Sequence, residues 1–528
     1  MAEADKKPWS QHRARAKEAW TKRDRWNKVL ADVYDFVAPH RRSTRLQEGG
    51  EGDRASRIFD PHATNVLHRV VGRILEDVFP SGEQFVMLEP GPAVKEDDLD
   101  KARAETEDIS TKIAPNFWRG DFDNAIAATI TDGLISSGYT LILKGDRARP
   151  VRFVNIPHDE MANDRGPYDE KHGFFWKRKW KRRAIKEAFP DGKFDADFKL
   201  QLETKGEEEV MLCQDLVFDA KKKRWRLCVY LDGKDCEDIH SENFKTCRIF
   251  CFEYFRLPGE DYGFGPILMN LPLIKTLNKT VELALKGAAL NALGIYTRIN
   301  DGVFNPDTAR LEPGAFWTVA RNGGPTGPSI ARLPNSTDPN LNMITIQDMR
   351  NSISVGMNDE EMPSPNKSPR AAAEIIERSR RQRKNHAGAF SRIIHDIFIA
   401  MLPAIMEIME EMQIIDKAVE IDQLLVRIKL VSPLGAAFRA RKAETYVEWA
   451  TVAASLAPQS LGMMTPLEAS LVQVGRDMGV PEAQLNSVSE QDMLAQRVRE
   501  GVAQALEAMQ AQAGGPPAAA NGDPAQAA

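Results

Sequence analysis

The sequence predicts an α+β chain that is mainly helical, and three observations carry this prediction. Apolar residues recur at helical spacing near the start of the 528-residue chain and again in its last third. Between these parts, residues 139–255 show the alternation and the β-branched and aromatic runs that are typical of strands. A long apolar helical stretch, 266–293, is then followed by a second one, 341–357, across a segment rich in glycine and proline.

The N-terminal part predicts four helices. Ser10 to Val37 form the first, which ends before Pro39 because proline cannot continue a helix. Asp60 followed by Pro61 is typical of an N-cap and first turn, so a second helix starts there. The remaining two helices are predicted from Glu96 to Phe117 and from Asp121 to Ser137.

The middle part predicts strands interrupted by one short helix, Lys181 to Phe189. The expected strands are Tyr139 to Lys144, Val151 to Ile156, Phe174 to Trp180 and Arg224 to Leu231. A basic run interleaved with Trp176 and Trp180 is compatible with nucleic-acid binding by charge and stacking. Its alternation favours an edge strand with aromatic residues inward and cations outward, because cations discourage edge-to-edge pairing.

All five cysteines lie in this middle part: Cys213, Cys228, Cys236, Cys247 and Cys251. An odd count in a long chain predicts free thiols in a reducing compartment. Cys247 and Cys251 with His240 make a zinc site conceivable, but no CxxC pair supports it. We therefore interpret the cysteines as small buried residues in β structure.

Motifs of catalysis are missing from the sequence. It contains no phosphate-binding GxxxxGK[ST] loop, no HExxH and no GxSxG, so we expect no enzyme and no cofactor. His158, Asp159 and Glu160 form one dense polar triplet, and a nuclease needs clustered carboxylates to hold metal ions. Adjacent residues point in different directions, so a solvated turn between two strands is the favoured interpretation and no metal site is predicted.

The first long helical stretch, 266–293, is too apolar to stand alone. Its charged residues are spaced four, three and four apart and so lie on one stripe of the helix: Lys275, Lys279, Glu282 and Lys286. Apolar residues cover the rest of its surface. Such a helix would be about 40 Å long, more than the width of a small domain. Copies of the chain in a ring would enclose it and leave the polar stripe facing a lumen.

The C-terminal part returns to helices. Residues 359–370 hold three prolines and predict an exposed loop. A long helical pattern over 371–415, with a kink expected at Pro403, precedes a strand from Leu424 to Val431. Three closing helices follow, and the last residues are rich in alanine, glycine and proline, which is typical of a disordered tail.

Composition limits the partners. The net charge of −5 argues against a broad grip on nucleic acid, because such binding depends on counterion release by Lys and Arg. It allows DNA to slide past the surface. The sequence has no run of about eighteen uncharged apolar residues and no N-terminal signal-peptide pattern. We therefore expect that the protein is made in the cytosol and does not associate with membranes.

Several short motifs, in this order, resemble the portal, or head-to-tail connector, proteins of tailed bacteriophages, particularly the short-tailed type. They are Phe59 to Thr64 (FDPHAT), Phe79 to Gly82 (FPSG), Tyr262 to Pro266 (YGFGP), Leu271 to Asn278 (LPLIKTLN), Asp301 to Val303 (DGV), Pro313 to Ala315 (PGA) and Ser432 to Leu434 (SPL). The resemblance covers residues from about 10 to 460. Pro80-Ser81 stands where a proline pair is usual, and Phe85-Val86 replaces Trp-Phe, which affects packing only.

The resemblance implies a portal fold assembled as a ring, with a wing, a two-helix stem, a clip and a helical crown. It divides the chain into a wing (1–264), stem helix 1 (265–293), a clip (294–340), stem helix 2 (341–357), a tunnel loop (358–370), a wing return (371–433), crown helices (434–512) and a disordered tail (513–528).

The resemblance also implies a role and partners. Such a protein forms a dodecameric channel at one capsid vertex, through which double-stranded DNA is packaged and ejected. Its partners would be further copies of itself, DNA in the lumen, the terminase large subunit, a tail adaptor or head-completion protein, the major capsid protein and a scaffolding protein. It would reside in the virion, and in the host cytoplasm during assembly.

Two groups of site residues follow from the resemblance. The expected lining of the DNA channel in stem and tunnel loop is Lys275, Lys279, Lys286, Asn366, Lys367 and Arg370. The expected clip contacts with partners and neighbouring subunits are Asp301, Phe304, Phe316, Trp317 and Arg321. For the stem lysines, pairing with Glu282 and with neighbouring subunits remains an equal alternative.

Two other classes of protein remain open at this point. One is a metal-dependent DNA-processing enzyme that uses His158, Asp159 and Glu160, and the other is a non-viral oligomeric scaffold or pore.

Overall fold

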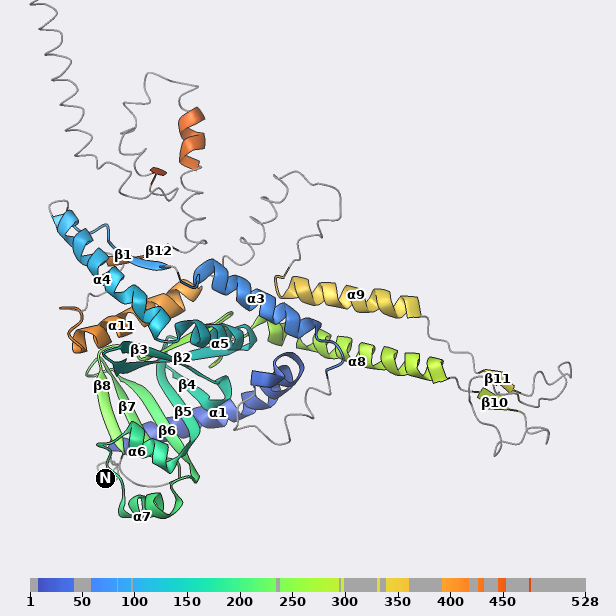
Figure 1. The fold of residues 1–528 in the computed structure, drawn as a ribbon, viewed down its shortest axis with the longest axis horizontal. Helices are drawn as coiled ribbons and strands as arrows, with labels where there is room; N and C mark the ends of the chain where they lie inside the picture. The colour runs from blue at the N-terminus through green and yellow to red at the C-terminus, as the bar shows by residue number, and fades with distance from the viewer. Residues whose placement is uncertain are drawn as a thin grey trace, which may run out of the picture. The chain divides into compact units, whose positions relative to one another are not determined.

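The computed structural model of the protein mixes helices and strands, as the sequence predicts (Figure 1). It describes residues 8–41, 58–82, 84–95, 98–233, 238–293, 296–298, 330–332, 339–359, 392–416, 426–431, 445–452 and 474–475. The chain divides into two compact units. The first comprises Met1–Glu83 and Met87–Ile428, and the second comprises Gln84–Val86 and Lys429–Ala528.

Most predicted helices are confirmed with small shifts of their ends. The α-helices among the described residues are α1 (Pro8–Val37), α3 (His62–Val78), α4 (Leu99–Arg119), α5 (Phe122–Ile135), α6 (Arg182–Ala188), α7 (Ala196–Lys205), α8 (Pro266–Leu293), α9 (Pro339–Gly356) and α11 (Ile399–Glu411). Short 3-10 turns span Pro39–Arg41 and His158–Glu160, and a π-helix, Ile394–Phe398, precedes α11. The sequence did not predict α7, because its polar residues leave only Phe198 buried.

Among the described residues, the strands form four sheets, of five, three, two and two strands. They are β1 (Val86–Pro90), β2 (Ser137–Asp146), β3 (Arg149–Ile156), β4 (Met161–Arg165), β5 (Lys171–Lys181), β6 (Glu209–Asp219), β7 (Arg224–Leu231), β8 (His240–Phe244), β9 (Ile249–Glu253), β10 (Tyr296–Arg298), β11 (Ile330–Arg332) and β12 (Val426–Leu430). The sheet orders are β3-β2-β9, β4-β5-β6-β7-β8, β10-β11 and β1-β12.

The two larger sheets share one core. Tyr139 of β2 and both Phe174 and Trp176 of β5 belong to the same buried cluster. Phe175 lies between Phe174 and Trp176 in the sequence, but it packs with Trp20 of α1 on the other face of β5. Since successive strand side chains point to opposite faces, the five-stranded sheet is covered on one face by the smaller sheet and on the other by α1.

A buried carboxylate joins the two sheets electrostatically. Glu253 on β9 is fully buried and pairs with Arg165 of β4 at 3.0 Å, with Lys171 of β5 at 3.1 Å and with Arg256 at 3.0 Å. Burial alone would raise the pKa of Glu253, but the three cations together lower it to about 2. The ion cluster therefore keeps this carboxylate charged inside the core.

The basic run is not on an edge strand as a whole, which corrects the prediction. β5 lies between β4 and β6, and the edges of this sheet are β4 and β8. However, β4 pairs with β5 only as far as Trp176, so residues 177–181 are paired on one side, with β6. Lys177 and Lys181 there pair with carboxylates of Asp232 and Glu207.

The prediction of free thiols is confirmed for the four cysteines that the structure describes. Cys213, Cys228 and Cys251 are buried in strands as predicted, whereas Cys247 is half-buried and lies between β8 and β9. Burial raises the pKa of the Cys228, Cys247 and Cys251 thiols to about 12, so these groups remain protonated. Cys236 lies outside the described residues.

Little of the second unit is described. Within it, the amide of Val431 donates to the carbonyl of Phe85 at 2.9 Å, and residues 445–452 are helical. The predicted crown (434–512) and tail (513–528) lie almost entirely outside the described residues.

The close approach of α5 to β2 yields a first prediction. A Cβ at Gly138 would lie 1.8 Å from the carbonyl oxygen of Thr129 on α5, so Gly138→Ala should force the layers apart and destabilise the protein by about 1–3 kcal/mol. Gly72→Ala is the matched control, because nothing lies within 4 Å of that helical position and alanine favours a helix by about 0.5–1 kcal/mol. Urea unfolding measures both. Equal midpoints for the two variants would contradict this packing.

Candidate functional site

Helices α8 and α9 lie side by side and run in opposite directions (Figure 1). A Cβ added at Gly356, the end of α9, would lie 2.5 Å from the side-chain oxygen of Asn270, near the start of α8. At the other end of the pair, β10 follows α8 and pairs in register with β11, with Tyr296 opposite Arg332. This pair corresponds to the two predicted stem helices.

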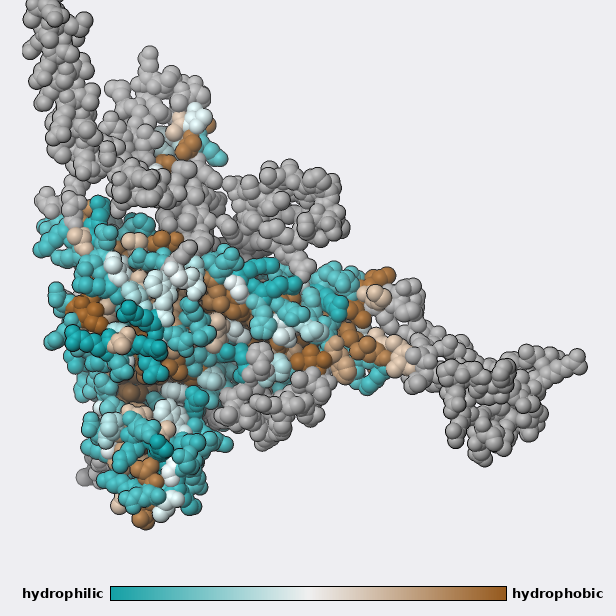
Figure 2. Space-filling view, viewed as in Figure 1, coloured by the Kyte–Doolittle hydropathy of each residue, from teal (hydrophilic) through white to brown (hydrophobic). Residues whose placement is uncertain are grey.

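The two halves of this helix pair differ in burial. Near its base, Ile274 and Leu277 of α8 and Ile353 of α9 are buried. Farther along, large apolar side chains are 55–70% exposed: Leu283, Leu285, Met343 and Ile344. Figure 2 shows hydrophobic side chains on the surface of this part of the molecule. Within the part of the chain that the structure describes, the outer half of the helix pair therefore lacks a complete apolar cover.

The stem lysines have carboxylate partners within the chain. Lys275 contacts Asp32 of α1, whereas Lys279 and Lys286 both pair with Glu282, at 2.9 and 2.5 Å. Hydrogen bonds from these two ammonium groups lower the pKa of Glu282. The structure thus contains the ion pairs with Glu282 that were the alternative to a role in lining the channel. Lys279 and Lys286 nevertheless remain more than 60% exposed.

The other predicted site residues lie outside the described residues. This holds for Asn366, Lys367 and Arg370 of the tunnel loop, and for Asp301, Phe304, Phe316, Trp317 and Arg321 of the clip. Their roles stay predictions.

The conspicuous polar contacts of this region come from α3 and the residues just before it. The sequence predicted Asp60 as the N-cap of α3, but Pro61 holds that position and no side chain caps the helix. The Asp60 carboxylate instead accepts a hydrogen bond from the amide of His62 at 2.9 Å. The other oxygen of the same carboxylate accepts from Arg350 of α9 at 3.0 Å. Asn278 of α8 accepts from the amides of Phe59 and Asp60. The start of α3 thus contacts both stem helices.

A second carboxylate repeats this connection where α9 ends. Asp359 is fully buried, and its two oxygens lie 2.7 Å from the guanidinium groups of Arg69 and Arg73, both on α3. The preceding residue, Asn358, has a left-handed backbone (φ 57°) and donates to the hydroxyl of Tyr254 at 3.2 Å. The first two residues of the predicted tunnel loop are therefore fixed to the folded body.

The triplet His158, Asp159 and Glu160 is buried, so the predicted solvated turn is wrong. His158 stacks on Tyr34 of α1 with ring centroids 4.2 Å apart, and Glu160 accepts from the indole of Trp176 at 3.1 Å. Burial lowers the pKa of His158 well below its usual value. These residues line the inside of the fold, and nothing in their geometry supports the nuclease alternative.

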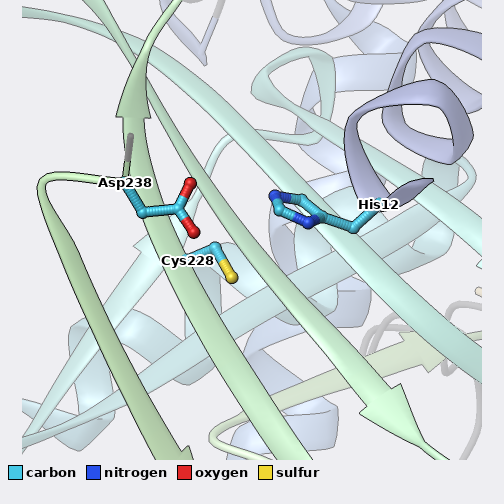
Figure 3. Close-up of side chains that lie close together, drawn as sticks. All are labelled: His12, Cys228 and Asp238. Carbon is cyan, nitrogen blue, oxygen red and sulfur yellow. The ribbon is translucent and has the colours of Figure 1, made fainter. Parts of the chain in front are cut away.

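A different group in the described residues brings three potential metal ligands together. One ligand atom each from His12, Cys228 and Asp238 lies within 4.8 Å of the other two (Figure 3). Burial, partly opposed by Asp238, lowers the pKa of His12 to about 4, so its imidazole is neutral. The sequence did not predict this group, because His12 lies more than two hundred residues from Cys228 and Asp238 in the chain.

The chain belongs to the family of bacteriophage head to tail connecting proteins, whose family model matches residues 10–485. This family is a structural component of phage particles rather than an enzyme family. None of the described helices is long and apolar enough to cross a membrane.

Solved structures that are similar to this chain include two particle structures. One is the neck of an empty GTA particle computed with C6 symmetry, at 12% identity and a TM-score of 0.33, covering 74% of this chain and 86% of that chain. The other is the virion of a native gene transfer agent particle, at 14% identity and a TM-score of 0.32, covering 75% and 88%. No curated protein matches the chain.

The contacts of Asp359 yield a second prediction. Asp359→Asn keeps the side-chain size but leaves Arg69 and Arg73 without their buried anion, which should lower the free energy of unfolding by about 3 kcal/mol. Glu187→Gln is the control, since its pair with Arg183 is exposed and should matter little. Urea unfolding compares the two variants, and a Glu187 variant that loses as much stability would show that burial is irrelevant here.

Proposed function

We propose that this connector is the portal subunit: a dodecameric ring at one capsid vertex through which double-stranded DNA is packaged and ejected. In this proposal α8 and α9 form the stem, and residues 294–340 form the clip that docks the terminase large subunit and later the tail adaptor. The wing would contact the major capsid protein and, during assembly in the host cytoplasm, a scaffolding protein. Membership of the connector family supports this role.

The distribution of exposed apolar side chains on α8 carries the proposal of a ring. Leu283 and Leu285 are 57% and 55% exposed. Residues that are two positions apart on an α-helix are separated by an angle of about 200° around its axis, so these side chains point to nearly opposite sides. Burying each of them fully would contribute about 1.5–3 kcal/mol. A single neighbour cannot cover both sides, whereas a ring places one neighbour on each.

The charges of the same helix suit a lumen rather than a lipid surface. Lys279, Glu282 and Lys286 form one polar stripe, and the two lysines are neutralised in part by the carboxylate between them. Each phosphate contact made by a lysine adds affinity, and a channel must release DNA as it moves. Paired lysines therefore offer weak contacts, which supports Lys275, Lys279 and Lys286 as channel lining.

Single substitutions on the two sides of α8 test the ring. Leu283→Asp and Leu285→Asp should each abolish rings and release folded monomers, because each places a charge in a subunit interface. Leu200→Asp on α7, 65% exposed, is the control and should leave rings intact. Light scattering after size exclusion measures the mass. Rings that persist in both α8 variants would contradict the proposed stem contacts.

The lysine pairs yield a prediction on DNA affinity. Glu282→Gln removes the carboxylate shared by Lys279 and Lys286, so both ammonium groups become available to phosphates. The ring should then bind DNA more tightly, and the slope of log K against log salt should steepen by about 0.9 for each lysine that reaches a phosphate. Fluorescence anisotropy over a range of salt measures this slope.

Glu187→Gln, on α6 of the wing, is the matched control for charge. An unchanged slope in the Glu282 variant, with rings intact, would show that these lysines do not face DNA.

A further inference from the structure

The group of His12, Cys228 and Asp238 joins the start of the chain to the segment of β7 and β8. His12 lies near the start of α1, Cys228 lies on β7, and Asp238 precedes β8. Figure 3 shows the imidazole facing the carboxylate and the thiol. A ligand atom of each residue lies within 4.8 Å of the other two, so small side-chain movements would let the three hold one metal ion.

The imidazole of His12 has a buried nitrogen atom without a hydrogen-bond partner among the described residues. His12 is only 9% exposed, and the atom concerned is its Nε2. Buried polar atoms are nearly always paired, so such an atom calls for a specific explanation. The side chain of Cys228 is 2% exposed, forms no disulfide and has a hydrogen bond with Asp238, beside the imidazole. A bound cation would give the imidazole nitrogen a partner and take the place of the thiol proton.

Two arginines flank the carboxylate without blocking it. Arg13 donates to Oδ1 of Asp238 at 3.0 Å, and its guanidinium lies 4.3 Å from the ring centroid of Tyr230. Arg226 lies 3.9 Å from Oδ2, beyond hydrogen-bond distance. Oδ2 thus remains available to a metal, while Arg13 orients the carboxylate. Carboxylates that ligate metals are ordinarily held by such outer hydrogen bonds.

We propose that His12, Cys228 and Asp238 bind one zinc ion. Imidazole nitrogen, thiolate sulfur and carboxylate oxygen are the donors that zinc takes, whereas magnesium and calcium take oxygen donors. On binding, the S–H bond of Cys228 breaks, its proton passes to solvent, and a sulfur–zinc bond forms. Three protein ligands leave the fourth tetrahedral position to water.

The ion would cross-link two distant segments of the proposed wing. It links residue 12 to residues 228 and 238, so it closes chain segments of more than two hundred residues. A ligand that binds the folded state and not the unfolded one stabilises the folded state. Zinc would therefore hold the start of α1 against the five-stranded sheet.

A cobalt titration of the full-length, tag-free protein, stripped of metal with a chelator, tests the site. One equivalent of Co²⁺ should produce a thiolate-to-cobalt absorption band and the visible bands of a tetrahedral ion, and Zn²⁺ should displace it. Cys228→Ser should abolish the thiolate band. Cys213→Ser, which removes a buried thiol from the neighbouring strand β6, should leave the band unchanged.

Two further variants keep the test decisive if Cys228→Ser does not fold. Asp238→Asn and His12→Gln should each weaken Co²⁺ binding by more than the roughly 10–100-fold that loss of an outer partner causes. Zinc should raise the melting temperature of the wild type and not of these variants. No thiolate band in the wild type, a band that survives in Cys228→Ser, or unchanged affinity in Asp238→Asn would overturn the site.

Discussion

The buried carboxylates of Asp60 and Asp359 fix where the helix pair α8–α9 leaves the folded body. Removing a carboxylate from water is strongly unfavourable unless cations and hydrogen-bond donors replace the water. Arg350 supplies the partner for Asp60, while Arg69 and Arg73 supply it for Asp359. Since each acid has its partner on another helix, α3 and α9 are tied by directional contacts as well as by apolar packing.

The helix pair is buried and hydrogen-bonded to the body at its base and uncovered farther out. At the base, Ile274, Leu277 and Ile353 are buried, and Asn278 binds the backbone before α3. Beyond it, Leu283 and Leu285 have no complete cover from the residues that the structure describes. In the proposed ring, a fixed base would set the direction in which each helix pair meets its neighbours.

The sequence predicted those elements whose own periodicity defines them. The first helix and the strands β2, β3 and β7 lie within a few residues of their predicted ends, because local patterns of apolar residues determine them. The apolar character of 266–293 likewise predicted a helix that needs neighbours. Its lysine stripe was visible in the sequence, but the pairing of Lys275 with Asp32 of α1 was not.

Features that depend on distant contacts escaped prediction. The basic half of β5 has an edge character, yet the order of strands is decided by tertiary pairing, and β5 is internal. The triplet around Asp159 is polar in sequence and buried in the fold, because α1 supplies Tyr34 and Arg23 to it. The group of His12, Cys228 and Asp238 could not be predicted from spacing, since more than two hundred residues separate His12 from the other two.

The most direct measurement of the central claim is an electron-microscope image of the purified wild-type protein. The account predicts closed rings with an axial hole wide enough for double-stranded DNA, in which the paired helices α8 and α9 surround the hole. A protein that remains monomeric at high concentration, or that assembles into open filaments, would contradict it.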